Sequence, residues 1–77
     1  MIPIPHCAVV TTPVEGRVRR LADDGTAVAA GDVVATMESA GRPVELRAPR
    51  AGRVAGALAG LAQPLGAGEG VLWLARA

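Results

Sequence analysis

The stretch PVEGRV at residues 13–18 decides the fold, because it recurs as PRAGRV at residues 49–54, an offset of 36 residues. A second segment, VAAGD at residues 28–32, recurs as LGAGE at residues 65–69, an offset of 37, so one inserted residue relates the two halves. Neither half could bury an apolar face alone. The repeat therefore predicts two packed sheets with quasi-two-fold symmetry, from halves of about 13–40 and 49–75.

Short apolar segments separated by turn residues run along the whole chain of 77 residues, which predicts a single domain over 1–77. Ten glycines and six prolines divide the sequence, a pattern typical of short strands joined by tight turns. The alanine-rich segment 55–62 favours a helix by composition, but Gly56 and Gly60 interrupt it and Pro64 follows. We expect strand and turn there. Other strands are expected at about residues 9–10, 16–18, 32–37, 44–46, 53–54 and 71–74.

The expected core consists of inward-facing aliphatic side chains from both sheets: Val18, Leu21, Val28, Val33, Met37, Val44, Leu46, Val54, Leu58, Leu65, Val71 and Leu74. Trp73 is the only aromatic residue. Strand alternation places it on the opposite face from its two leucine neighbours. If those leucines face the core, Trp73 is partly exposed, and it either packs on the sheet or marks a partner contact.

Charge and composition disfavour several functions. The formal net charge is +1, and all eight basic residues are arginines spread among acidic residues, which disfavours nucleic-acid binding. The arginines at positions 42, 47, 50 and 53 form either a docking patch or solvated strand faces. No apolar run is long enough to span a membrane, and the start MIPIP lacks the basic region of a signal peptide. These features predict a soluble, cytoplasmic protein.

Catalytic and metal-binding groups are scarce. Cys7 is the only cysteine and His6 the only histidine, so neither a disulfide nor a structural metal site is expected. Nothing near this pair would orient His6 as a base, which favours a partly exposed thiol over a reactive one. The chain has no tyrosine and no cluster of carboxylates, and a domain this small has little room for a substrate pocket. We expect that the protein is not an enzyme.

The order and spacing of several short motifs resemble the biotinyl/lipoyl attachment domain. They are the Pro-x-x-Gly-x-Val segment at 13–18, GDVV at 31–34, MES at 37–39 and AP-x-x-G-x-V at 48–54. The resemblance covers residues 4–75 or thereabouts. It implies a flattened barrel-sandwich of two four-stranded antiparallel sheets, with the modified lysine at the tip of a tight hairpin. Glu38-Ser39, the VEL segment at 44–46 and the opening Ile4-Pro5 favour the lipoyl branch.

The position of the modified lysine falls on Gly41, between Ala40 and Arg42, and the chain contains no lysine. Lipoyl and biotinyl groups are joined by an amide to a lysine amine. Glycine has no side chain to acylate, and an arginine guanidinium stays protonated and is a poor acyl acceptor. Neither cofactor is therefore expected. The Ala40-Gly41 pair suits a hairpin turn, since glycine accepts positive φ.

The favoured interpretation is a non-catalytic docking module for an enzyme that recognises carrier domains. Its expected contact residues are Glu38, Ser39, Ala40, Gly41 and Arg42, with charge complementarity from acidic side chains such as Glu38 and Glu45. An alternative is a standalone carrier in a specialised biosynthetic pathway, with its group attached at Ser39 or Cys7. A resemblance in architecture alone and an engineered change at the tip are further alternatives.

Overall fold

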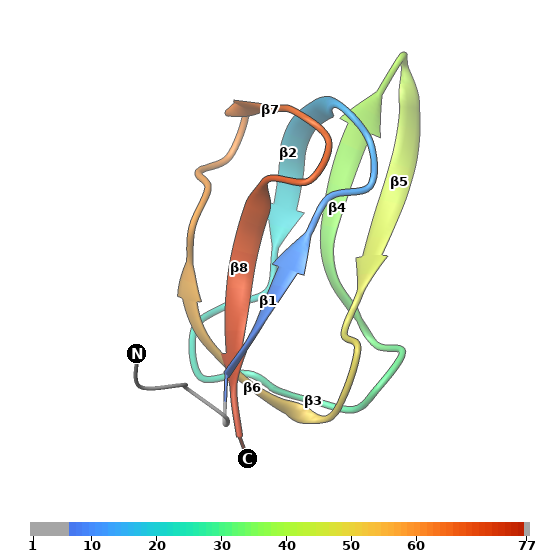
Figure 1. Ribbon diagram of the computed structural model, residues 1–77. Coiled ribbons are helices and arrows are strands. Elements are labelled where there is room, and N and C mark those ends of the chain that lie inside the picture. Colours follow the sequence, from blue (N-terminus) through green and yellow to red (C-terminus); the bar gives the residue numbers. More distant parts are fainter. Residues whose placement is uncertain (1–6, 77) are drawn as a thin grey trace.

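The computed structural model describes residues 7–76, and every regular element in that range is a β-strand. Eight strands form two four-stranded antiparallel sheets packed face to face (Figure 1). Sheet A has the strand order β1-β8-β6-β3, and sheet B has the order β5-β4-β2-β7. This is the predicted all-β barrel-sandwich. The strands are β1 (Cys7–Thr11), β2 (Gly16–Leu21), β3 (Ala27–Val28), β4 (Val33–Ser39), β5 (Arg42–Arg47), β6 (Gly52–Ala57), β7 (Pro64–Leu65) and β8 (Gly70–Ala75).

Equivalent hydrogen bonds join the two halves of the chain. The Thr12 amide donates to the Glu69 carbonyl at 3.0 Å, and 36 residues later the Ala48 amide donates to the Asp32 carbonyl at 2.8 Å. The return bonds also match, from Gly68 to Thr12 at 2.7 Å and from Gly31 to Ala48 at 2.8 Å. Each half thus supplies the residue that hydrogen-bonds to the Gly-acid turn of the other half. One set of bonds continues the pairing of β1 with β8 in sheet A, and the other continues the pairing of β5 with β4 in sheet B.

Val33 is the first correction to the expected core, since it is 40% exposed and its neighbour Val34 is buried. The register of β4 against β5 passes from Val33–Arg47 directly to Ala35–Leu46, so Val34 is an extra residue at a β-bulge. A bulge reverses the alternation of faces. Val34 and Ala35 therefore both point inward, and Val33 points outward.

Leu58 is the second correction, because it is 53% exposed. The amides of Leu58 and Ala59 both donate to the Val71 carbonyl, at 2.8 and 3.2 Å. The equivalent carbonyl of the first half, Val34, accepts a bond from Ala22 at 2.9 Å. The single residue inserted in the second half therefore falls at Leu58, and Ala59 occupies the buried position beside it.

The rest of the expected core lies between the sheets. Leu21, Val28 and Val44 are partly buried against it, and the other expected members are buried. Six buried aliphatic residues lie outside the expected core, three of them at the β4 bulge or after the insertion and the others in or beside strands. They are Val10, Val34, Ala35, Ala48, Ala59 and Leu72.

Thr12 is a buried polar residue whose hydroxyl is satisfied locally. Its Oγ1 donates to the Val14 carbonyl at 2.6 Å and accepts from the Val14 amide at 3.2 Å.

The alanine-rich segment 55–62 forms the end of β6 followed by turns, as predicted. No helix in residues 7–76 is long and apolar enough to cross a membrane. The expectation for His6 and the Cys7 thiol lies outside the described residues and side chains.

Candidate functional site

The hairpin of β4 and β5 projects from one end of the sandwich, as Figure 1 shows at the upper right. Its last paired residues are Ser39 and Arg42, which leaves a two-residue turn at Ala40 and Gly41. These residues have φ values of 51° and 77°. Positive φ at both central residues is the signature of a type I′ turn, whose twist matches that of the flanking strands. The predicted turn therefore forms at the position expected from the sequence.

The tip is open to solvent. Ala40, Gly41 and Arg42 are exposed, and a Cβ added at Gly41 would meet no atom within 4 Å. Glu38 and Ser39 are the last two residues of β4, and both are half-buried. The five expected contact residues thus lie together, with three forming the exposed tip and two its base.

The acidic groups near the tip already have cationic neighbours. Glu38 Oε1 lies 3.7 Å from Arg19 Nη1, and Glu45 Oε1 lies 2.8 Å from Arg47 Nη2. All four side chains are more than two-fifths exposed, so these pairs contribute little to stability. Glu45 lies further along β5 than the tip, opposite Thr36. Among residues 7–76, Arg42 forms no ion pair and is the charged side chain of the tip itself.

Gly16 supports the base of the hairpin, a role that the sequence analysis did not assign. A Cβ at this position would collide with the Glu38 carbonyl oxygen and would lie 3.3 Å from Ser39 Cβ. The turn before β2 can therefore lie directly against β4. Its equivalent, Gly52, stands in the same relationship to Ala75 in the other half. The matching glycines of the repeat were the signal for this close approach.

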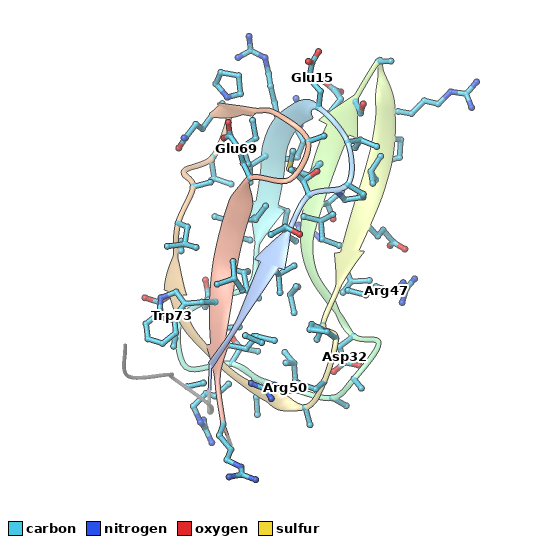
Figure 2. The ribbon with its side chains drawn as sticks, in the orientation of Figure 1. Glu15, Asp32, Arg47, Arg50, Glu69 and Trp73 are labelled. Atoms are coloured by element: carbon cyan, nitrogen blue, oxygen red, sulfur yellow. The ribbon has the colours of Figure 1, made fainter. Side chains whose placement is uncertain are left out.

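A groove of about 360 Å³ lies beside the Gly16 turn. Glu15 and Arg17 contribute its charged groups, and Pro64, Leu65 and Gly66 complete the wall. Arg17 Nη1 donates to the Ala62 carbonyl at 3.2 Å, which fixes the guanidinium against the loop before β7. Figure 2 shows Glu15 at the same end of the molecule as the hairpin tip, with Arg50 at the opposite end.

In the described part of the chain, no three histidine, cysteine or carboxylate side chains come together. Residues 7–76 also contain no buried side-chain nitrogen or oxygen without a hydrogen-bond partner. The tip is an exposed two-residue turn on a hairpin whose strands pair as far as Ser39 and Arg42.

Solved structures resemble this chain in fold. No family model and no curated protein sequence matches it. A segment of a single-chain, multi-domain long-chain acyl-CoA carboxylase superposes over 100% of the chain, with a TM-score of 0.87 and 25% identity. A segment of the Kluyveromyces lactis urea carboxylase superposes over 96%, with a TM-score of 0.85 and 24% identity.

A third match comes from a different class of protein. A segment of the ectoine utilization protein EutE (DoeB) from Ruegeria pomeroyi superposes over 90% of the chain, with a TM-score of 0.75 and 30% identity. The chain spans only 8%, 6% and 22% of the lengths of these three proteins. The fold is therefore that of a small module found within larger proteins, including two carboxylases.

Proposed function

We propose that this domain is a non-catalytic module of the biotinyl/lipoyl type that carries no lysine-linked group. In this proposal it docks, through the hairpin tip at residues 38–42, onto an enzyme that recognises carrier domains. One observation carries the proposal: the β4–β5 hairpin has an exposed two-residue tip, but Gly41 stands where the carriers that it resembles have their lysine.

The chemistry of attachment supports the first half of this proposal. An acyl group can be joined to a protein amine only where a deprotonated amine is presented. Gly41 has no side chain, Arg42 carries a guanidinium that stays protonated, and the sequence contains no lysine elsewhere. The hairpin retains the shape of a carrier's tip without its nucleophile.

The charge distribution at the tip supports the second half. Glu38 and Glu45 lie beside arginines of the same sheet, whereas Arg42 projects from the tip without an ion pair to any residue from 7 to 76. An acidic pocket on the partner would complement Arg42. Such complementarity mainly raises the association rate and selects against wrong partners.

The comparisons agree with a module of this kind. Two of the matching segments belong to carboxylases, and the segment occupies a small fraction of each of those chains. A domain that acts within or beside a larger enzyme fits this pattern. The match to the ectoine utilization protein adds support for uses of the fold outside carboxylases.

Arg42 can be compared with Arg50, an exposed arginine at the opposite end of the molecule (Figure 2). We would capture partners from the native cells with the wild-type domain, Arg42→Ala and Arg50→Ala, and identify them by mass spectrometry. The proposal predicts an enzyme of the carrier-recognising type that is captured by wild type and Arg50→Ala and is lost with Arg42→Ala. Equal capture by all three domains would contradict docking through the tip.

A further inference from the structure

One edge of sheet B is only partly covered by a neighbouring strand. β7 pairs with β2 at Gly16 and Arg17 alone. The loop before β7 then makes two backbone hydrogen bonds to Val18, at 2.7 and 3.3 Å. Beyond Val18, no strand in residues 7–76 pairs with β2 on this side. The last three residues of β2 therefore form a free strand edge.

The alternation of β2 determines which backbone groups face this edge. The amide and carbonyl of Val18 point away from β4, because both bond to the loop before β7. Arg19 is the extra residue where the register against β4 shifts. The next residue to point away from β4 is Leu21, and Ala22 points toward β4 again, where its amide bonds at 2.9 Å. The N–H and C=O of Leu21 consequently face the free edge.

The second half of the chain has an equivalent position 36 residues later. Val54 bonds to the loop before β3, through its carbonyl at 2.7 Å and its amide at 2.9 Å. The register of β6 against β8 shifts between Val54 and Gly56, so Ala57 is the next residue to point away from β8. The pairing of β3 with β6 stops before Val54. Leu21 and Ala57 are therefore matching free positions on the two sheets.

A groove of about 470 Å³ is lined by both of these residues. Ala22 and Leu61 extend its apolar wall, and Leu61 is 65% exposed. Figure 1 shows the segment after β6 running along this side of the sandwich to β7. Unpaired N–H and C=O groups at a strand edge are matched by another extended backbone, which adds a strand to the sheet. An extended peptide therefore suits both the free backbone groups and the apolar wall.

Charged side chains on either side of Leu21 define the order of residues in such a peptide. Arg20 precedes Leu21 and Asp23 follows it, and both charged residues are exposed and line the groove. Neither forms an ion pair with another residue in the range 7–76. Every strand pair of this fold is antiparallel. An antiparallel peptide would place a basic residue opposite Asp23, an apolar residue opposite Leu21 and an acidic residue opposite Arg20.

We propose that this groove binds an extended peptide segment of a partner protein, which adds a strand to the free edge of β2. Its residues follow the order basic, any, apolar, acidic. The apolar residue donates its N–H to the Leu21 carbonyl and accepts from the Leu21 amide, and its side chain packs against Ala57 and Leu61. The groove shares no lining residue with the hairpin tip, so the proposal stands apart from the function proposed for residues 38–42.

Synthetic peptides provide a probe with matched controls. The probe is the acetylated and amidated hexapeptide Thr-Lys-Thr-Val-Glu-Thr, and the first control, Thr-Glu-Thr-Val-Lys-Thr, exchanges only its two charges. A second control carries an N-methyl group on the valine of the probe, which removes the N–H that bonds to Leu21. In a nuclear magnetic resonance titration, both controls should bind about tenfold more weakly than the probe. Equal binding by the three peptides, or binding by none, would overturn the proposal.

The charge order is tested from the protein side by a pair of charge reversals. Arg20→Glu should reduce the preference for the probe over its charge-exchanged control, because the acidic residue of the probe then faces a carboxylate. Arg50→Glu changes the net charge equally but lies outside the groove, so it should keep the wild-type preference. The same preference in both variants would overturn the assigned order of the peptide.

Amide hydrogen exchange of the wild-type domain tests the free edge directly. The Leu21 amide should exchange without protection in the domain alone and should become protected when the probe is bound. Its chemical shift in the absence of peptide should not depend on protein concentration. Protection without peptide would show that the chain itself covers the edge, and a concentration-dependent shift would show that a second copy does. Either result would overturn the proposal.

Discussion

The Trp73 indole lies so close to Gly56 that a Cβ at position 56 would stand 2.6 Å from its Nε1 atom. The two residues are cross-strand partners on β8 and β6, at the point where the register of these strands shifts. The equivalent cross-strand partners in sheet B are Thr36 and Arg20. The position of Gly56 is therefore occupied in sheet B by the long side chain of Arg20, which lies beside the small side chain of Thr36. The ring in sheet A therefore depends on the absence of a side chain at Gly56.

Gly56→Ala should destabilise the domain by about 1–3 kcal/mol, because the indole must leave its position to make room for the methyl group. Chemical denaturation followed by circular dichroism would measure the loss. Gly60→Ala is the control, since its nearest neighbour is Gln63 Oε1 at 3.9 Å and its φ is not positive. Equal losses in the two variants would contradict the packing described for Trp73.

Val33→Ala and Val34→Ala make a matched pair of adjacent substitutions with identical chemistry. Val34 is 1% exposed, so Val34→Ala should lower the free energy of unfolding by about 2–3 kcal/mol, because the smaller side chain leaves a cavity. Val33 lies outside the core, so Val33→Ala should lower the free energy of unfolding by less than about 1 kcal/mol. Urea unfolding would compare them. A larger loss at Val33 would place the β4 bulge in another register.

Ala40→Asn should stabilise the hairpin by up to about 1 kcal/mol. Ala40 has a φ of 51°, a region in which asparagine is tolerated better than alanine, and Asn-Gly is the preferred pair in a type I′ turn. Gly41→Val, with a β-branched residue at a φ of 77°, should destabilise by about 1–2 kcal/mol. Thermal unfolding would show whether each variant is more or less stable than the wild-type domain. A destabilising Ala40→Asn would contradict the assigned turn.

Gly41→Lys tests whether the amine is the only missing part of a carrier site. A Cβ at position 41 meets open space, so the introduced lysine would project from the tip. We expect a lipoate or biotin ligase to acylate this variant, as seen by an added mass at position 41. Arg50→Lys, at the far end of the molecule, should stay unmodified. An unmodified Gly41→Lys would show that the tip differs from a carrier's in more than one residue.

The sequence predicted the features that local turns and the repeat encode. The recurrence of PVEGRV as PRAGRV indicated two equivalent halves, and glycine at position 41 indicated the hairpin tip. The tip residues Ala40, Gly41 and Arg42 were located by the resemblance to carrier domains. The suitability of the Ala40-Gly41 pair for a turn of positive φ agreed with that position.

The errors came from features with no local signature. Strict alternation placed Val33 in the core, but an extra residue at Val34 reverses the faces. The repeat required one inserted residue without locating it, and the hydrogen bonds to Val71 place it at Leu58. Contacts between distant strands were also missed. The repeated glycines signalled a close approach at Gly16, but its partner, the Glu38 carbonyl, depends on which strands become neighbours, as does the pairing of Trp73 with Gly56.

The absence of a covalently attached group is the central claim of the account, and the intact mass of the protein purified from its native cells tests it most directly. We expect the mass of the unmodified chain, with peptide mapping showing no adduct at any residue. An added mass mapped to Ser39, Cys7 or another side chain would contradict the docking module, and would instead identify a carrier with a non-lysine attachment.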